Sequence, residues 1–178
     1  MVRVIITASL CFLSTLSLGA EFKVTLGAGQ SSVVYRADDP ALENDDHKST
    51  APFFALNLKN NIDYAQKHWL GAGVDFEKID DMQVTGFRAL DYQWRFSPRW
   101  HTGAFIGAAS VDNIVPQNGY YYGAHIGLFA LEKRLSVDLE WRHGEGLARD
   151  KQPGEPSEGR PDIFLDYSSL GLQASWHF

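Results

Sequence analysis

Hydrophobic and polar residues alternate along most of the chain after residue 20. In the segment FKVTLGAG, Phe22 and Val24 fall on one side, and Lys23 and Thr25 fall on the other. Because side chains two positions apart point to the same face of a β-strand, this alternation predicts a strand with one apolar and one polar face. The same alternation recurs at 69–79, 90–96, 120–131, 135–143 and 169–178.

Two more segments are strand-like but less regular. The segment APFFALNL is expected to turn Phe54, Leu56 and Leu58 outward, whereas WHTGAFIGAAS carries small and apolar residues on both faces, so its register stays open. Eight strands are predicted in all. Short links such as AQKH, SPR and LEKR alternate with long charged segments at 36–50 and 144–161. Short turns at one end and longer loops at the other are typical of a transmembrane β-barrel.

A soluble β-sandwich shows the same alternation, so other features must separate the two folds. The polar face is rich in Gly, Ser, Gln and charges of both signs instead of long solvated Lys side chains. Aromatic residues gather near the strand ends, and Trp and Tyr favour the half-wet interface of a membrane. These aromatic residues are Trp69, Trp94, Phe96, Trp100, Trp141 and Trp176, with Tyr120, Tyr121 and Tyr122 at an opposite end.

The last predicted strand continues to the final residue. Apolar side chains recur at every second position through Leu170, Leu172 and Ala174 to Trp176 and Phe178. This ending resembles the C-terminal signal of bacterial outer-membrane β-barrels, which the barrel assembly machinery recognises. Its physical counterpart is closure, because the last strand must pair with the first or both edges stay unsatisfied in lipid. An ordinary soluble strand is the alternative.

The resemblance covers residues 21–178 and is to the small eight-stranded outer-membrane barrels, the OmpX-like and OmpA-barrel-like proteins, with no subfamily assigned. It implies an all-β fold, an eight-stranded antiparallel up-and-down transmembrane β-barrel, in the outer membrane of a Gram-negative bacterium. The partners that it implies are outer-membrane lipids, lipopolysaccharide and the barrel assembly machinery, while the ligand stays unknown.

Residues 1–20 have the pattern of a secretory signal peptide. Arg3 gives a positive start, and an apolar stretch follows and ends in small residues, with a predicted cut after Ala20. Leu18 is not ideal at its place before the cut, so the site could shift by a residue. An N-terminal membrane anchor is the alternative. The single cysteine, Cys11, lies in this segment, so the mature chain is expected to have no disulfide.

Composition excludes some classes of function. The chain carries 16 Lys and Arg against 22 Asp and Glu, a net charge of -6, without a clustered basic stripe. Nucleic acid is therefore not an expected partner. The carboxylates in the segment 38–47 lack the order and central Gly of an EF-hand, and the histidines are scattered. We expect no metal site and no cofactor.

The polar faces of the predicted strands would line the lumen of the barrel. An eight-stranded barrel is about wide enough for side chains to fill, and charges in such an interior must pair because isolated buried charges are costly. Two hypotheses follow, a filled structural core or a gated narrow pore whose ion pairs rearrange. The residues predicted to form this lumenal polar network are Lys23, Asp75, Glu77, Asp91, Arg95, His125, Asp138, Glu140 and Arg142.

One histidine raises the possibility of an enzyme. Some eight-stranded barrels are lipid A deacylases that use a His, a Ser and a carboxylate near the outer rim, and His143 lies at a loosely similar place. The deacylase pattern has a serine two residues further on, where this chain has Glu145. The alternative is a rim histidine that shares hydrogen bonds with Glu145 or Asp166.

The function predicted from the sequence is non-enzymatic. The chain is expected to be a membrane-embedded barrel that displays extracellular loops, with a role in surface interaction or envelope integrity. A narrow channel for small solutes or ions is one alternative. A lipid A deacylase-like hydrolase that uses His143 is the other.

Overall fold

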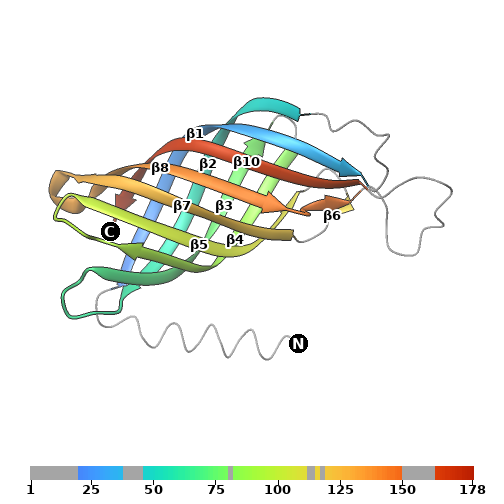
Figure 1. Cartoon of the computed structure of the whole chain (residues 1–178). Coiled ribbons are helices and arrows are strands. Elements are labelled where there is room, and N and C mark those ends of the chain that lie inside the picture. Colours follow the sequence, from blue (N-terminus) through green and yellow to red (C-terminus); the bar gives the residue numbers. More distant parts are fainter. Residues whose placement is uncertain (1–19, 38–45, 80–81, 112–114, 117–118, 150–162) are drawn as a thin grey trace, which may run out of the picture.

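The structure, a computed structural model, describes residues 20–37, 46–79, 82–111, 115–116, 119–149 and 163–178 (Figure 1). The elements are β1 (Ala20–Ala37), β2 (Asp46–Asn61), β3 (His68–Ile79), β4 (Met82–Trp94), β5 (Trp100–Val111), β6 (Val115–Pro116), β7 (Gly119–Ala130), the 3₁₀ turn η1 (Leu131–Lys133), β8 (Leu135–Glu145), β9 (Ala148–Arg149) and β10 (Ile163–His177). No helix within these ranges is long and apolar enough to cross a membrane. Except for Ala20, the predicted signal peptide lies outside the described residues, as do positions 38–45 of the acidic segment.

Eight antiparallel strands close into a barrel in the order β1-β2-β3-β4-β5-β7-β8-β10, and β10 pairs back to β1. The closing register is long and continuous, from Lys23 opposite His177 to Ala37 opposite Ile163. The backbone N–H of Phe178 adds a bond of 2.9 Å to the carbonyl oxygen of Phe22. Closure leaves no free edge between the first and last strands, so the sheet satisfies its backbone hydrogen bonds internally.

The faces of the barrel are the reverse of those of a soluble protein. Arg88, Lys59 and Glu140 are at most 1% exposed and point inward, whereas Leu26 and Leu172 are each 63% exposed on the outside. Side chains alternate strictly along β7, β8 and the described part of β10, and most of β2 also alternates. Phe54, Leu56 and Leu58 face outward as predicted. An apolar exterior around a polar interior is the arrangement of a transmembrane barrel.

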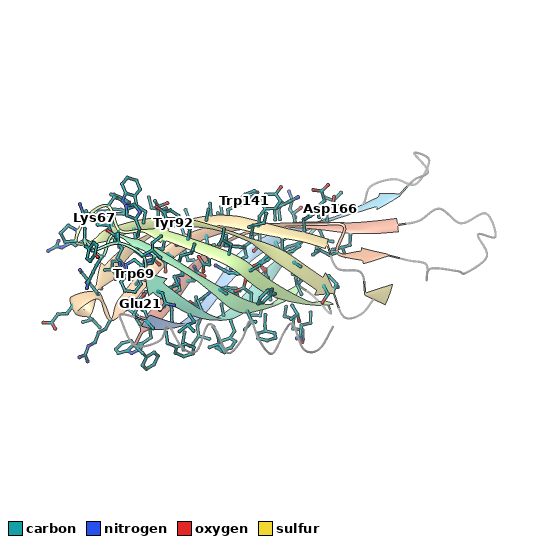
Figure 2. The ribbon with its side chains drawn as sticks, turned by 90° about the horizontal axis from the view of Figure 1, so that it is seen from below. Glu21, Lys67, Trp69, Tyr92, Trp141 and Asp166 are labelled. Atoms are coloured by element: carbon teal, nitrogen blue, oxygen red, sulfur yellow. The ribbon has the colours of Figure 1, made fainter. Side chains whose placement is uncertain are left out.

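The two ends of the barrel differ. The turn end contains the short connections 62–67, 95–99 and 131–134. Ala20, where β1 begins, and Phe178, which follows β10, lie at the same end. Figure 2 shows Glu21, Lys67, Trp69 and Tyr92 toward this end and Asp166 toward the opposite, loop end. At the loop end, β6 pairs with β9, and β9 pairs with β10, which extends the sheet locally.

An apolar layer fills the lumen near the loop end. Tyr121 and Tyr167 stack with their ring centroids 6.5 Å apart, and Phe105 packs 5.0 Å from Tyr121. Each of these rings is at most 4% exposed. The sequence predicted a polar lumen throughout, so this layer is a difference that the structure reveals. Its members are Val33, Ala51, Ile79, Val84, Phe105, Ala109, Val111, Tyr121, Leu147, Leu165 and Tyr167.

The turn between β2 and β3 is organised by one carboxylate. Asp63 Oδ1 accepts hydrogen bonds from the backbone N–H groups of His68 at 2.7 Å and Lys67 at 2.9 Å, and from Asn61 Nδ2 at 3.2 Å. Desolvation acts to raise the pKa of Asp63, but these hydrogen bonds outweigh it and lower the pKa. The charged carboxylate thus stabilises the short connection between the adjacent strands β2 and β3.

A β-bulge in β4 changes which residues face the lumen. The register against β5 shifts between Arg88 and Leu90, so Ala89 is the extra residue. Arg88 and Asp91 therefore both point inward although they are three positions apart. Gly107 lies opposite the bulge, where a Cβ atom would come within 1.7 Å of the carbonyl oxygen of Phe87. Only glycine allows the two backbones to approach this closely.

Candidate functional site

Five charged side chains form a continuous chain across the middle of the lumen, in the order Asp75, Arg88, Glu140, Arg142 and Glu77. Arg88 donates from Nε to Asp75 Oδ2 at 2.7 Å and from Nη2 to Glu140 Oε1 at 2.7 Å. Arg142 donates from Nε to Glu140 Oε1 at 2.8 Å and from Nη1 to Glu77 Oε2 at 3.0 Å. We call this group the ion-pair chain, and none of its members is more than 3% exposed.

The ion-pair chain joins opposite walls of the barrel. Asp75 and Glu77 come from β3, Arg88 from β4, and Glu140 and Arg142 from β8. In the order of the eight barrel strands, β3 and β8 lie four places apart, which puts them across the lumen from each other. Backbone pairing connects only neighbouring strands, so these side chains supply links that the sheet cannot.

Neutral groups donate further hydrogen bonds to the carboxylates of the ion-pair chain, although Asp75 Oδ1 has no partner among the described residues. Tyr121 donates its hydroxyl to Asp75 Oδ2 at 2.6 Å, and Gln173 Nε2 donates to Glu140 Oε2 at 3.0 Å. The hydroxyls of Ser31 and Ser169 donate to Glu77 Oε1 at 2.9 and 2.7 Å. A buried ion pair recovers the several kcal/mol that each charge loses on leaving water only when such additional bonds are present.

Aromatic rings cover both guanidinium groups. The Arg88 guanidinium lies 3.8 Å from the ring centroid of Phe105, and that of Arg142 lies 3.4 Å from the ring of Phe53. A desolvated cation over a ring face gains about 2 kcal/mol. These contacts join the ion-pair chain to the apolar layer of the loop end, to which Phe105 belongs.

A second group of polar residues lies beside the ion-pair chain. Lys59 Nζ is 2.8 Å from Asp91 Oδ1 and donates to Gln93 Oε1 at 3.3 Å. Asn57 Nδ2 donates to Asp91 Oδ2 at 3.2 Å. Asp91 also lies 3.9 Å from Arg88 Nη1, so this group is electrostatically continuous with the ion-pair chain.

A third group lies toward the turn end. Asp138 accepts a hydrogen bond from the hydroxyl of Ser136 at 2.9 Å and contacts His101 Nε2. His177 Nε2 is 2.9 Å from Ser136 Oγ, and its Nδ1 is 2.9 Å from Glu21 Oε1. His101 and His177 are therefore part of the lumen, since they are at most 6% exposed.

Arg95 and His125 belong to the predicted lumenal network but not to the ion-pair chain. Arg95 follows the end of β4 and pairs with Glu21 at 2.5 Å, while its guanidinium lies 4.1 Å from the ring of Trp69. It is therefore a residue of the turn end. His125 is also buried. Its Nδ1 lies 3.9 Å from Glu140 Oε2, which is too far for a hydrogen bond, and neither ring nitrogen has a hydrogen-bond partner among the described residues.

Arg88, which links Asp75 to Glu140 in the ion-pair chain, was not among the residues predicted for the lumen. Strict alternation back from Asp91 assigns Arg88 to the lipid face, and the bulge at Ala89 reverses that assignment. One signal could have found it, because an arginine on the lipid face near the bilayer midplane costs about 2–4 kcal/mol. A charged residue at mid-strand predicts an inward side chain, and hence a break in the alternation.

Side chains fill the lumen at the level of these residues. Asp91, Asp138 and Glu140 are 0% exposed and Arg88 is 1% exposed. The apolar layer of the loop end lies beyond them and is equally buried. Within the described ranges, no group of three or more His, Cys, Asp and Glu side chains is placed to hold a metal ion.

The predicted hydrolase residues lie on the outer face of the rim. His143 is half-buried, and its Nδ1 is 2.8 Å from the hydroxyl oxygen of Ser168 on β10. In a Ser-His-acid triad, the serine faces Nε2 and the acid holds Nδ1. Here Ser168 occupies the side that the acid would take. Glu145 is exposed two positions further along the same face.

The residues of the predicted assembly signal lie on the closing seam. Trp176 is 40% exposed and Phe178 is 71% exposed, both on the outer face. The Phe178 ring lies 6.0 Å from that of Phe22 on β1 and 6.5 Å from that of Trp176. Their recognition by the assembly machinery stays a prediction, but the exposed positions leave both side chains accessible from outside the barrel.

Comparison with known proteins gives matches of fold. No protein-family model and no curated protein matches the sequence. Ail, the attachment invasion locus protein of Yersinia pestis, is 9% identical with a TM-score of 0.51, covering 90% of this chain and 100% of Ail. Neisserial surface protein A is 14% identical with a TM-score of 0.51, covering 90% and 99%. The outer membrane protein AlkL is 13% identical with a TM-score of 0.52, covering 90% of each chain.

The chain has the fold of a small eight-stranded outer-membrane β-barrel. This confirms the fold and the resemblance predicted from the sequence, and the predicted location in the bacterial outer membrane agrees with these neighbours. The similarity at these identities is one of fold, and no subfamily follows from it.

Replacing Arg88 by Met tests the ion-pair chain of the barrel. The change leaves Asp75 and Glu140 buried without the cation between them, so we expect the free energy of unfolding to fall by about 3–5 kcal/mol. Urea unfolding in lipid vesicles, followed by tryptophan fluorescence, measures this change. Lys78→Met, at an exposed position, is the control and is expected to stay near wild type. Adding Asp75→Asn and Glu140→Gln to Arg88→Met should recover part of the loss, and an unchanged Arg88→Met barrel would contradict the role.

Lipid A deacylation tests the His143 and Ser168 pair. Because Nδ1 faces the serine, we expect no release of fatty acid from lipid A by the wild-type barrel, by His143→Ala or by Ser168→Ala. Thin-layer chromatography of the lipid products is a sufficient measurement. Release by wild type that both substitutions abolish would show that the rim pair is catalytic.

Proposed function

We propose that this protein is a non-enzymatic outer-membrane barrel that presents its loop end at the cell surface for attachment or for envelope integrity. The apolar outer face of the barrel is suited to lipid, and buried side chains fill its lumen, which supports a role outside solute transport. The loop end is the part of the molecule that is left to meet a partner outside the cell, since long loops of such barrels are extracellular.

The observation that carries this proposal is the length of three adjacent strands. A transmembrane β-strand needs about 9–11 residues. β1 has 18 residues, β2 has 16 and β10 has 15, and they are neighbours in the sheet. Figure 1 shows them running toward the loop end. The sheet β10-β1-β2 therefore continues beyond the hydrocarbon and forms a platform above the membrane.

The outward residues change character where the platform begins. Leu26 and Leu170 are exposed apolar residues of the lipid belt. Further toward the loop end, Ser32, Thr50 and Ser168 take the same face on β1, β2 and β10. Hydroxyl groups suit the headgroup region and the water above it, and the long charged segments of the sequence are attached to this platform.

The charges of the loops favour particular partners. Ail, which shares the fold, has been solved in complex with the heparin analogue sucrose octasulfate. In this chain the segment 38–46 carries Asp38, Asp39, Glu43, Asp45 and Asp46, which disfavour a polyanion. The basic residues of the segment 149–160 are the part suited to the phosphates of lipopolysaccharide.

Shortening the loops tests the display function. Replacing residues 38–45 and 150–162 with short Gly/Ser links should leave the barrel folded, as shown by heat-modifiable migration on a gel. Cells producing this variant are expected to match a deletion strain in surface attachment and detergent resistance, while Lys67→Gln in a turn should match wild type. Full restoration of both properties by the loop-shortened barrel would contradict the proposal.

Planar-bilayer recording tests the channel alternative. The buried ion-pair chain and the apolar layer both block the lumen, so the refolded wild-type barrel is expected to leave the conductance at baseline, with a porin as positive control. Reproducible conductance steps from the wild-type protein would favour the gated pore instead.

A further inference from the structure

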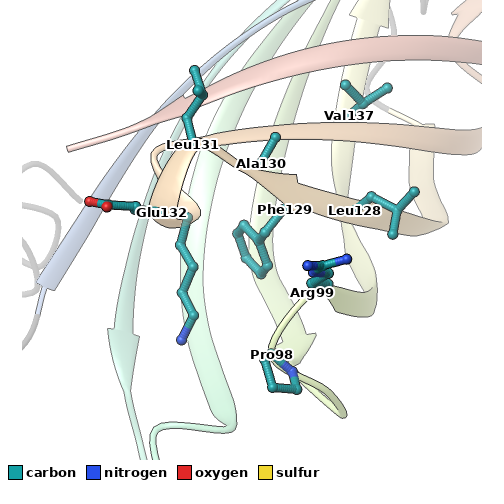
Figure 3. A pocket seen from close by; sticks show the side chains of 9 residues that line it. Pro98, Arg99, Leu128, Phe129, Ala130, Leu131, Glu132 and Val137 are labelled. Carbon is teal, nitrogen blue, oxygen red and sulfur yellow. The ribbon is translucent and has the colours of Figure 1, made fainter.

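A hollow of about 760 Å³ lies on the outside of the barrel at the turn end, between the connections 95–99 and 131–134 (Figure 3). Its walls combine two kinds of side chain. Leu128 and Val137 form an apolar wall and are paired across β7 and β8. Arg99 and Lys133, both exposed, add two cations from the two connections. The hollow is therefore amphipathic, with charge on the side of the turns.

The hollow lies at the level of the aromatic girdle of the membrane interface. Trp100, which follows Arg99, is 42% exposed and is paired with Leu128. Leu128 and Val137 are 41% and 48% exposed on the lipid-facing side. A molecule in the hollow would therefore touch hydrocarbon at one end and the headgroup region at the other.

We propose that this hollow binds a phospholipid of the periplasmic leaflet, with an anionic headgroup between Arg99 and Lys133 and an acyl chain along Leu128 and Val137. The turn end of such a barrel faces the periplasm, so the leaflet follows from the orientation. The site does not depend on the surface role proposed above. Basic side chains at a membrane surface attract anionic lipids, while their stems lie along apolar surface.

The one acidic residue at the hollow does not neutralise the pair of cations. Figure 3 shows the carboxylate of Glu132 pointing away from Arg99. Arg99 itself is anchored through its backbone, because its carbonyl oxygen accepts a hydrogen bond of 2.7 Å from Phe129 N. The phosphate of a lipid would therefore meet two cations and no facing carboxylate.

The connection that carries Lys133 has an unusual backbone. Leu131, Glu132 and Lys133 have φ angles of 45°, 54° and 70°, and none of them is glycine. Such left-handed conformations are unfavourable for these residues, and they persist where the surroundings hold them. The Arg134 N–H closes the turn with a bond of 3.0 Å to the carbonyl oxygen of Leu131. The strained turn holds Lys133 at the edge of the hollow.

Native mass spectrometry of the refolded barrel tests the proposal, with dioleoyl phosphatidylglycerol, the phosphatidylcholine of the same chains, and inorganic phosphate as probes. Wild type is expected to retain phosphatidylglycerol in preference to phosphatidylcholine. Arg99→Gln and Lys133→Gln are each expected to weaken its retention about fivefold, and the double variant more, since each cation near the surface contributes about that ratio. Val137→Thr, which adds a hydroxyl to the apolar wall, should also weaken it.

The control is Lys67→Gln, which removes an exposed cation from the turn between β2 and β3 and should retain the lipid as wild type does. Heat-modifiable migration shows that each variant is folded before it is compared. Equal retention of phosphatidylglycerol by the double variant and wild type would overturn the site. Binding of inorganic phosphate as tight as that of the lipid would overturn a lipid as its occupant.

Discussion

The hydrocarbon of a bilayer offers no hydrogen-bond partner to a peptide group, and the rest of this structure depends on that constraint. A sheet can cross such a medium only when its first and last strands pair, which β1 and β10 do along their length. Closure then gives the sheet one face toward lipid and one toward the lumen, and along regular strand alternate residues face each of them. The outward positions of Leu26 and Leu172 and the inward positions of Lys59 and Glu140 follow from this one requirement.

A closed barrel also needs bonds between strands on opposite sides of its lumen, and the buried charges supply them. Backbone bonds connect only adjacent strands, so contacts across the lumen of an eight-stranded barrel come from side chains. Glu77 on β3 and Arg142 on β8 meet across the lumen at 3.0 Å, and Arg88 links β4 to both walls through Asp75 and Glu140. Directional bonds between opposite walls also oppose a slip of strand register, since a shift of one residue would turn each charge toward lipid.

The sequence was most informative where periodicity is strict and least where the backbone departs from it. The alternation through Asp138, Glu140 and Arg142 predicted their shared face, and the apolar ending at Phe178 predicted closure. Arg88 was missed because one extra residue, Ala89, reverses the alternation, and a bulge has no signature in hydropathy. The apolar layer around Tyr121 joins strands that are not neighbours, and the bond between His143 and Ser168 joins residues that lie opposite each other on β8 and β10. Such contacts require the register of the barrel, which alternation alone does not determine.

The ion-pair chain and the apolar layer fill the lumen by different physical means, and together they favour a function at the ends of the barrel. The ion-pair chain is held by charged hydrogen bonds that water would weaken, whereas the layer around Tyr121 and Tyr167 excludes water by packing. The hydroxyl of Tyr121 donates to Asp75, so the layer that keeps water out also completes the ion-pair chain beneath it. Opening a path would require breaking both at once. A barrel built in this way is suited to act at its ends, where β1, β2 and β10 project and where Arg99 and Lys133 flank the hollow at the turns.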